Sequence, residues 1–463
     1  MQNILKKLIP DALKIIIVGC GKVGRALTEK LSMEGHDITI IDRRMNLVQE
    51  LSNKYDVMGM VGNGASYSVQ REAGVENTDL IIAVTGSDEL NLLCCTIARK
   101  VGKCAAIARV RHHDYSAELS YLRIQLGLSL IINPELEAAR EIARLLRLPS
   151  ALSINSFARG HAEMVKFKIP QDSKLDGMKI SALGQEVGKN ILVCAVEHGG
   201  SLMIPDGSFI LQARDEVSFV ATPRNSQTFF RNIGLETKQI RSTMIIGGGK
   251  SSYYLAAQLL GMGVDVKIIE ISRERCEELT MLLPDATIIC GDGSDEDLLK
   301  EEGIDQIESF VPLTGIDEEN ILLTLYAKRI PDIKVVTKIN RITFNDVIDN
   351  LELGSVVYPR YITAEMIIGY VRAMQNSIGS NIETLYHIFD GRAEAIEFHV
   401  EASSPVIGIP LKDLPTKDNL LITCINRNGQ ILIPRGQDSI QMGDTVVIVT
   451  THTGFRDIGD IIR

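Results

Sequence analysis

Two glycine-rich segments of the sequence contain the residue types that hold phosphate groups. In such a loop the first glycine permits a tight turn, the second lets the backbone approach a pyrophosphate, and the third lets a helix pack on a strand. The N-terminus of the following helix adds unpaired N–H groups and a positive dipole. The residues of the first loop, which follows an apolar run and opens a helical pattern, are Gly19, Cys20, Gly21, Lys22, Val23 and Gly24.

An acidic residue stands where such a loop needs one, 18 positions after Gly24. Asp42 ends the apolar run 36–42. We expect it to accept hydrogen bonds from a ribose hydroxyl and to repel a 2′-phosphate, which favours NAD(H), ATP or ADP over NADP. The adjacent Arg43 and Arg44 weaken this preference slightly, since a guanidinium can bind the extra phosphate.

Other polar residues follow strand-like runs of the same segment. Thr85 and Gly86 come after the run 80–84, and Arg109 lies near the end of the run 105–110. The carboxyl ends of parallel strands meet at one edge of a sheet, where ligands bind. We predict that Arg109 contacts a phosphate, the alternative being a surface salt bridge. Lys22 is either a second phosphate contact or a solvated loop lysine.

The same pattern occurs again later in the chain. An offset of 228 residues separates Gly19 from Gly247 and Asp42 from Glu270. Thr85 to Asn91 and Arg109 recur at an offset of 229 as Thr314 to Asn320 and Lys338. Ser252 replaces the third glycine in the second copy, so a loop without a ligand is a stronger alternative there. The other residues of the second predicted loop are Gly247, Gly248, Gly249, Lys250 and Ser251.

The elements that must position these residues follow from the alternation of apolar strands with helical stretches. This alternation predicts βαβ units, hence two Rossmann-like parallel sheets with both faces covered. A second, β-rich unit also repeats: residues 203–207 and 214–222 correspond to 432–436 and 443–451. The predicted fold is therefore α/β, with a small α+β domain after each parallel-sheet domain.

Four domains follow from this order. Helices beginning at Pro134 and Pro359 close the two parallel-sheet units, because proline is tolerated in the first helical turn. We expect the junctions near Leu148, Gln239 and Gln375. The predicted domains are residues 1–148, of which 1–13 form an extension, and then 149–238, 239–375 and 376–463.

Composition excludes several classes of protein. The net charge of −10 argues against bulk nucleic-acid binding, which needs a positive surface. No apolar run approaches the roughly 20 residues of a membrane helix, so we expect the chain not to span a membrane. The eight cysteines form no C-x-x-C pair and are expected to be core residues, neither disulfides nor zinc ligands.

The repeated features hold a ligand, and none of them is catalytic. No histidine recurs at an equivalent position, and no Ser/His/Asp set or metal-ligand spacing is present. We therefore predict a nucleotide sensor with no catalytic residue and no metal. The alternatives are an NAD-dependent oxidoreductase with duplicated Rossmann domains and a scaffold with vestigial sites. Asp215 and Asp444 occur at equivalent positions before strands. We expect both to be turn residues and not ligands of a divalent ion.

With these motifs in order, the sequence resembles the RCK (KTN) family, in its tandem form of the TrkA type. The resemblance rests on the glycine loop, the acidic strand end, Gly62-Asn63, the segment Thr85 to Asn91, and Arg109. The unit that contains these motifs occurs twice, and a β-rich module follows each copy. The resemblance places the nucleotide site on the residues named above. Three features depart from the family pattern: the extension Met1–Leu13, Asn63 in place of aspartate, and the second glycine loop.

The resemblance also implies a setting. It implies a cytoplasmic protein that binds NAD(H), ATP or ADP, sits on the cytoplasmic face of the inner membrane, and forms a ring, as a homotetramer. Its expected partner is a potassium-translocating membrane subunit of the TrkH/TrkG type, which it gates. A nucleotide would act by binding one ring conformation better than another.

Overall fold

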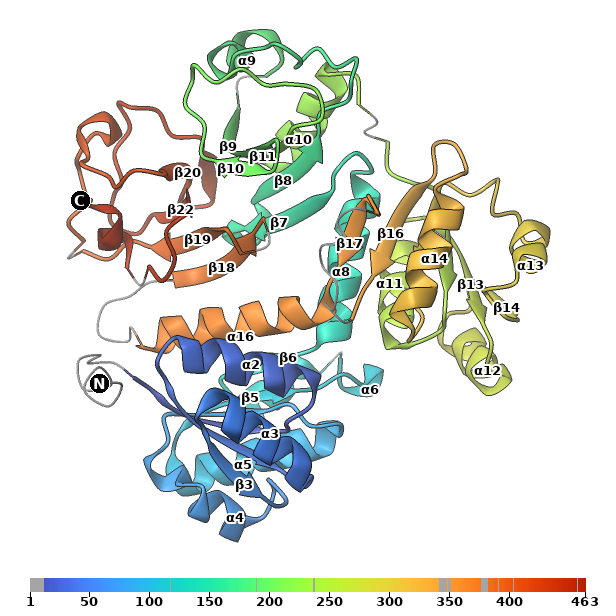
Figure 1. Cartoon of the computed structure of the whole chain (residues 1–463), viewed down its shortest axis with the longest axis vertical. Coiled ribbons are helices and arrows are strands. Elements are labelled where there is room, and N and C mark those ends of the chain that lie inside the picture. The colour runs from blue at the N-terminus through green and yellow to red at the C-terminus, as the bar shows by residue number, and fades with distance from the viewer. Residues whose placement is uncertain are drawn as a thin grey trace. The chain divides into compact units, whose positions relative to one another are not determined.

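The computed structural model forms two compact units. Unit 1 contains Met1–Ala138 and Tyr358–Ile368, and unit 2 contains Ala139–Val357 and Gly369–Arg463. The chain passes from unit 1 to unit 2 within α8 (Pro134–Arg147), returns to unit 1 just before α16 (Pro359–Gln375), and leaves it again within α16 (Figure 1). The structure describes residues 12–463 except 117, 189, 236–237, 341–347, 349–350, 376–381, 390, 403 and 456, so most of the predicted N-terminal extension lies outside the described residues.

Unit 1 is built on a six-stranded parallel sheet of order β3-β2-β1-β4-β5-β6. Every residue of β4 is buried, as is every residue of β1 after Lys14, so both faces of the central strands are covered. The strand order reverses direction between β1 and β4. The strands are β1 (Lys14–Val18), β2 (Asp37–Asp42), β3 (Met58–Val61), β4 (Leu80–Ala83), β5 (Ala105–Arg109) and β6 (Leu130–Ile132).

Helices connect these strands (Figure 1). Ser87 caps the longest connecting helix, since its side chain accepts a hydrogen bond from Leu90 N. Cys94, Cys95 and Cys104 lie in the core beneath the sheet, as small apolar side chains do. Between β1 and α8, the helices are α2 (Lys22–Met33), α3 (Met45–Tyr55), α4 (Tyr67–Glu72), α5 (Asp88–Gly102), α6 (His113–Ser116) and α7 (Leu119–Gln125).

Unit 2 contains a second parallel sheet with the equivalent order, β14-β13-β12-β15-β16-β17. Its strands are β12 (Ser242–Ile246), β13 (Asp265–Glu270), β14 (Thr287–Cys290), β15 (Ser309–Pro312), β16 (Lys334–Lys338) and β17 (Ser355–Val357). Its helices are α11 (Lys250–Gly261), α12 (Arg273–Leu282), α13 (Glu296–Glu301) and α14 (Asp317–Ala327). Of α16, which follows β17, only the part from Gly369 on belongs to unit 2. Helix α16 begins at Pro359, as the sequence predicted, and ends at Gln375. The predicted duplication of the parallel sheet is confirmed.

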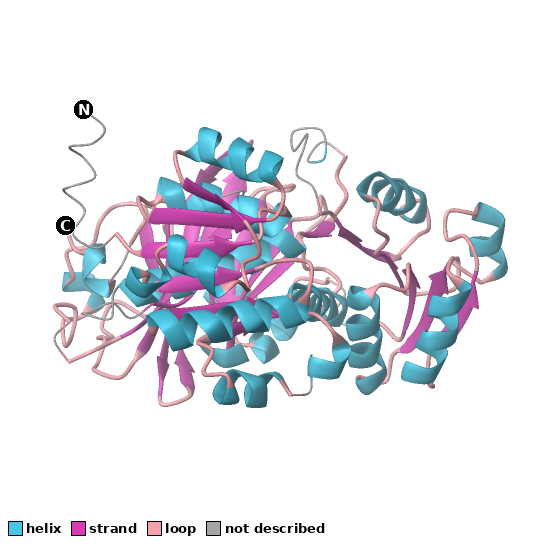
Figure 2. Cartoon of the chain, turned by 90° about the horizontal axis from the view of Figure 1, so that it is seen from below, coloured by secondary structure: helices cyan, strands magenta, loops and turns pink. Residues whose placement is uncertain are grey.

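Two antiparallel sheets complete unit 2. Figure 2 shows the strands and helices of the whole chain in separate colours. The first has the order β10-β9-β11-β8-β7 and comprises β7 (Ser153–Phe157), β8 (Ala162–Lys168), β9 (Ile191–His198), β10 (Ser201–Met203) and β11 (Glu216–Ala221), with α9 (Ile180–Glu186) and α10 (Pro223–Asn232). The second has the order β18-β19-β22-β20-β21 and comprises β18 (Ile382–Ile388), β19 (Ala393–His399), β20 (Leu420–Arg427), β21 (Gln430–Leu432) and β22 (Thr445–Thr450).

The two antiparallel sheets share one hydrophobic core. Phe157 and Met164 of the first sheet belong to the same buried cluster as Ala395 and Val449 of the second. The Tyr386 hydroxyl donates to Ser156 O at 3.1 Å, which adds a polar contact at the edge of the cluster. These small modules therefore stabilise one another within unit 2.

Two expectations from composition can be compared with the structure. All eight cysteines are free, and seven are buried as predicted, whereas Cys290 at the end of β14 is exposed. Cys290 lies on an edge strand, where no neighbouring strand covers it. Within the described part of the chain, no helix combines the length and apolar character that crossing a bilayer requires.

Candidate functional site

The first glycine loop lies at the point where the strand order of unit 1 reverses. Gly19 follows β1 and Thr85 follows β4, and these two strands are neighbours in the sheet. Gly19 has φ +106°, which only glycine adopts readily, and a Cβ there would lie 3.0 Å from Thr85 N. The loop thus passes against the second polar segment at the crevice where open α/β sheets bind ligands.

The other two glycines of the loop differ in their surroundings. A Cβ on Gly24 would lie 1.8 Å from Gly19 O, so only glycine allows this approach of α2 to the loop. A Cβ on Gly21 would meet nothing within 4 Å. Gly21 is the N-cap of α2, and its φ of −70° is open to any residue. The space above Gly21 is therefore free for a ligand at the positive end of the helix.

Asp42, at the end of β2, holds the loop in place. Its Oδ2 accepts a hydrogen bond from Cys20 N at 2.8 Å, and its Oδ1 accepts one from Arg44 N at 2.9 Å. Burial raises the pKa of Asp42, but hydrogen bonds from Arg44 and Cys20 outweigh burial and leave the pKa below its ordinary value. The carboxylate is therefore ionised. Arg44 Nε and Nη2 also donate to it, at 3.2 and 3.3 Å, so a ribose hydroxyl would bind Asp42 by replacing contacts of the exposed Arg44 side chain.

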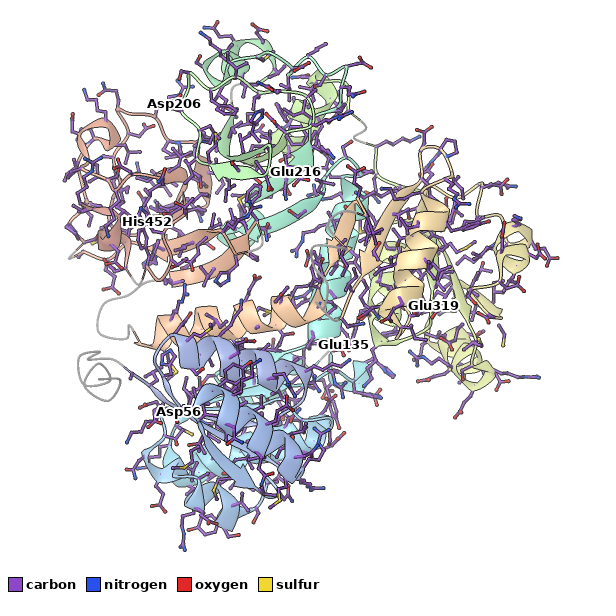
Figure 3. The ribbon with its side chains drawn as sticks, in the orientation of Figure 1. Asp56, Glu135, Asp206, Glu216, Glu319 and His452 are labelled. Carbon is purple, nitrogen blue, oxygen red and sulfur yellow. The ribbon has the colours of Figure 1, made fainter. Side chains whose placement is uncertain are left out.

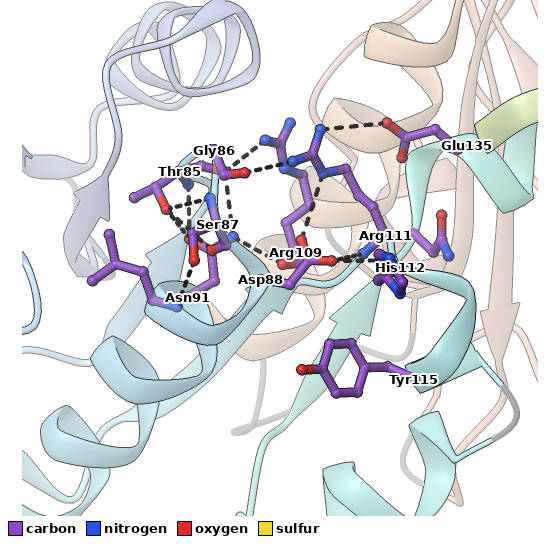
Figure 4. Close-up of polar contacts among 12 residues, drawn as sticks. Thr85, Gly86, Ser87, Asp88, Asn91, Arg109, Arg111, His112, Tyr115 and Glu135 are labelled. Carbon is purple, nitrogen blue, oxygen red and sulfur yellow. Dashed lines mark hydrogen bonds and ion pairs between the residues drawn. The ribbon is translucent and has the colours of Figure 1, made fainter. Parts of the chain in front are cut away.

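The end of β4 is tied to the end of β5 by one buried amide. Asn91 Oδ1 accepts hydrogen bonds from Thr85 N at 2.8 Å and Thr85 Oγ1 at 2.7 Å, and Asn91 Nδ2 donates to Arg109 O at 2.8 Å (Figure 4). Asn91 is fully buried. Its amide fixes the two predicted site segments relative to each other.

Arg109 points back toward the same segment. Its Nη2 donates to Thr85 O at 2.6 Å, while its Nε is buried without a hydrogen-bond partner among the described residues. Burial, followed by the nearby Arg111, lowers the pKa of Arg109. An anionic group at the crevice would relieve both effects, because it offers an acceptor and an opposite charge. A surface salt bridge, the alternative considered from sequence, does not describe this half-buried side chain.

Three charged residues join this cluster without having been predicted from the sequence as site residues. Arg111 Nη2 donates to Gly86 O at 2.6 Å, and its Nη1 lies 3.8 Å from an oxygen of Glu135, which Figure 3 labels. Asp88 Oδ2 accepts from the backbone N–H groups of Arg111 and His112, both at 2.8 Å (Figure 4). Of these three residues, Asp88 could have been found from the sequence, because it recurs as Asp317 in the second copy.

The second crevice has equivalent geometry. Gly247 has φ +93°, and Gly248 N donates to Glu270 Oε2 at 2.5 Å, as Cys20 N does to Asp42. Asn320 Oδ1 accepts from Thr314 N at 2.9 Å. Lys338 Nζ donates to Leu313 O at 2.7 Å, so the lysine also points back toward the end of β15. The repeat in sequence is thus a repeat of hydrogen bonds.

Two contacts make the second crevice different. Ser252 replaces the third glycine, and its Oγ donates to Gly247 O at 2.5 Å, where the first copy has no side chain. Arg275, on α12, donates from Nε to Gly248 O at 2.7 Å, bringing a guanidinium onto the loop. The sequence pattern did not reveal Arg275, because the first copy has no counterpart with this role. The two crevices therefore offer different charges to a ligand.

The recurring aspartates of the small modules have partners that explain them. Asp215 accepts a hydrogen bond from Gln212 N at 2.9 Å and lies 2.7 Å from His198 Nδ1. Asp444 accepts hydrogen bonds from Gln441 N, Arg427 Nε and Arg427 Nη2, each at 2.8 Å. Both carboxylates stabilise the turn before a strand, which agrees with the expectation from sequence.

Protein-family models match most of the chain. The TrkA-N domain model matches residues 15–134 and 243–359, and the TrkA-C domain model matches residues 164–234 and 395–463. The chain belongs to the TrkA family. The Trk system potassium uptake protein TrkA homolog of Archaeoglobus fulgidus is 31% identical over 97% of this chain and 100% of its own length. The TrkA of Vibrio alginolyticus is 32% identical over 96% of this chain and 97% of its own.

Solved structures share the fold of this TrkA-family chain. The GsuK RCK domain superposes with a TM-score of 0.62 at 19% identity, covering 97% of this chain and 96% of that one. The GsuK channel bound to NAD has the same TM-score at 18% identity, over 96% of this chain and 77% of its own. The fold class predicted from the sequence and its tandem RCK resemblance are confirmed.

Proposed function

We propose that this chain is the nucleotide-binding regulatory subunit of a Trk-type potassium-uptake system. The observation that carries the proposal is the doubled crevice, in which a carboxylate, an open N-cap glycine and a basic side chain meet at a strand-order reversal. The chain's TrkA-family membership supports the potassium system, since its relatives are named for potassium uptake. The expected partner is a potassium-translocating membrane subunit of the TrkH/TrkG type.

The first crevice supports NAD(H) as its ligand, with ATP and ADP as alternatives of the same chemistry. The open N-cap at Gly21 offers helix N–H groups to a diphosphate, and the unpartnered Nε of Arg109 offers a charged donor. Asp42 would accept from a ribose hydroxyl. A fold relative, the GsuK channel, was solved bound to NAD.

The assignment of residues remains part of this proposal. The first site comprises Gly19 to Gly24, Asp42, Thr85, Gly86 and Arg109. The second comprises Gly247 to Ser251, Glu270 and Lys338. The division into four domains at about residues 148, 238 and 375 belongs to the same proposal. So does the location, as a peripheral ring on the cytoplasmic face of the inner membrane.

Regulation requires no chemical step in the chain itself. A nucleotide that binds one ring conformation better shifts the ring toward that conformation by its differential affinity. A near-complete switch needs about 5.5 kcal/mol, which the several sites of a homotetramer can share. The two crevices differ in charge, so the two sites can differ in ligand or affinity.

The decisive test uses two matched glycines. Gly21 and Gly249 are both N-caps at which a Cβ meets nothing within 4 Å. Gly21→Asp should abolish binding at the first crevice, because its carboxylate faces the diphosphate, while aspartate remains a good N-cap. Gly249→Asp should do the same at the second. Titration calorimetry with NADH, NAD, ATP and ADP would measure both, with the two alanine variants as controls.

Three outcomes would contradict the proposal. Unchanged affinity of Gly21→Asp for all four nucleotides would reject the first site. A thermal-shift panel in which no nucleotide raises the melting temperature of the wild type would favour a scaffold with vestigial sites, since a ligand of the native state must raise it. Substrate-dependent oxidation of NADH by the purified chain would instead favour an oxidoreductase.

A further inference from the structure

Three side chains with metal-binding atoms converge immediately after β5. His112, His113 and Asp114 each offer one ligand atom, and these atoms all lie within 4.8 Å of one another. His112 Nδ1 is 3.2 Å from Asp114 Oδ2, and His113 Nε2 is 3.2 Å from Asp114 Oδ1. The two imidazoles are stacked, with centroids 4.4 Å apart. One carboxylate thus faces a nitrogen of each ring.

We propose that His112, His113 and Asp114 bind one divalent transition-metal ion of the Zn²⁺ type. Zinc takes histidine nitrogen and carboxylate oxygen at about 2.0–2.2 Å, so tetrahedral ligand atoms stand about 3.3–3.6 Å apart. The three ligand atoms lie within 4.8 Å of one another, so binding requires them to move closer by about 1 Å. His112 Nδ1 would also give up the 3.4 Å hydrogen bond that it accepts from Asp114 N. Two imidazoles favour zinc and its neighbours over Mg²⁺ and Ca²⁺, which take oxygen ligands. The fourth position is left for water.

The backbone that carries these ligands is already held in place. His112 N and Arg111 N both donate to Asp88 Oδ2 at 2.8 Å, and Asp88 is only 5% exposed. The ligand side chains nevertheless reach solvent, with 40% of His112 and 67% of Asp114 exposed. An ion can therefore enter a segment whose backbone needs little ordering. Asp88 also connects this segment to the crevice, since it begins the helix that follows Gly86.

The trio belongs to one copy of the repeat only. At the offset of 229 residues, the second copy has Arg341, Ile342 and Thr343, which supply no metal ligand at neutral pH. The proposal therefore predicts one ion per chain, although the glycine loops occur twice. It does not depend on nucleotide binding, so either can fail without the other.

Zinc titration of the full-length chain tests this site. The chain is stripped with EDTA and carries Cys290→Ser, because Cys290 is an exposed free thiol that could bind zinc elsewhere. Calorimetry should give one Zn²⁺ per chain, and no Mg²⁺ binding at the same concentrations. His112→Gln and His113→Gln should each weaken zinc binding at least about tenfold. His161→Gln, at an exposed histidine whose Nδ1 contacts only a carbonyl, should leave it unchanged.

A second measurement separates a built site from surface binding. Co²⁺ in place of Zn²⁺ should give the visible absorption of a low-coordinate ion, and Asp114→Asn should remove it without changing the melting temperature of the metal-free chain. Zinc affinity that is unchanged in all three ligand variants would overturn the proposal. So would an equal loss in His161→Gln, or Mg²⁺ binding as tight as that of Zn²⁺.

Discussion

At the scale of single residues, the acidic side chain at the end of the second strand has two roles. Asp42 and Glu270 each accept the N–H of the second loop residue, so they shape the loop before any ligand arrives. The sequence pattern suggested only the ribose contact. Both roles use the carboxyl oxygens as acceptors, and two oxygens can accept from several donors at once.

Asp42→Ala should therefore weaken nucleoside recognition more than phosphate binding, and also loosen the loop at Cys20. We expect reduced discrimination between ADP and inorganic pyrophosphate in calorimetry, with Glu270→Ala as the matched change at the second crevice. The pKa of Asp42 lies below its ordinary 3.8 in the folded state. The stability it contributes is thus fully present above that value and is lost only as the pH falls through the folded-state pKa. Equal losses for ADP and pyrophosphate would contradict a nucleoside role.

At the scale of elements, one lysine joins β16 to the turn that leaves α8. Lys334 Nζ donates to Pro149 O at 2.6 Å, Ala151 O at 2.7 Å and Ser355 Oγ at 2.8 Å. Burial lowers the pKa of Lys334 to about 7. The first small module is thereby attached to the second parallel sheet, through residues about 185 positions apart in sequence.

This lysine makes the stability of unit 2 depend on pH. Between pH 7 and the ordinary lysine pKa of 10.5, the unfolded chain binds more protons at Lys334 than the folded chain, so stability rises with pH. Lys334→Met should remove this slope, which is at most about 1.4 kcal/mol per pH unit. Urea unfolding at pH 7, 8.5 and 10 would measure it. The exposed Lys174→Met is the control, and a slope that persists in Lys334→Met would assign it to other groups.

At the scale of the whole molecule, the shared core of the two antiparallel sheets couples the halves of the repeat. Phe157 is 1% exposed and its ring lies 5.1 Å from that of Tyr386, edge to face. Phe230 is also buried, and its ring packs against those of Phe167 and Phe219 in the first module. Substitutions at these two positions therefore distinguish the coupling between the two modules from the stability of the first module.

Phe157→Ala should cost about 3–5 kcal/mol, as other buried phenylalanines do. Because the cavity opens in the shared core, we expect calorimetric unfolding to split into two transitions, one for each small module. Phe230→Ala should lower a single transition without splitting it further. Identical unfolding profiles for the two variants would show that the shared core does not couple the modules.

Much of this protein could be predicted from the sequence because the deciding interactions are local. The glycine loop, its helix and the acidic strand end lie within about 25 residues, and their spacing reflects one turn geometry. The doubled pattern then fixed two parallel sheets in one chain. Gly19 and Gly24 were predictable for this reason, since a positive φ and a close helix approach admit no other residue.

The remaining features depend on contacts between distant segments. Arg275, Lys334 and the trio beginning at His112 have no periodicity and no repeated partner, so no pattern distinguishes them from solvated side chains. The repeated β-rich segments predicted two small modules, but not that the two modules share one hydrophobic core. The sequence by itself determined which local motifs form and how often. The tertiary structure decided which charges and which apolar faces meet, because packing brings together residues that are far apart in the chain.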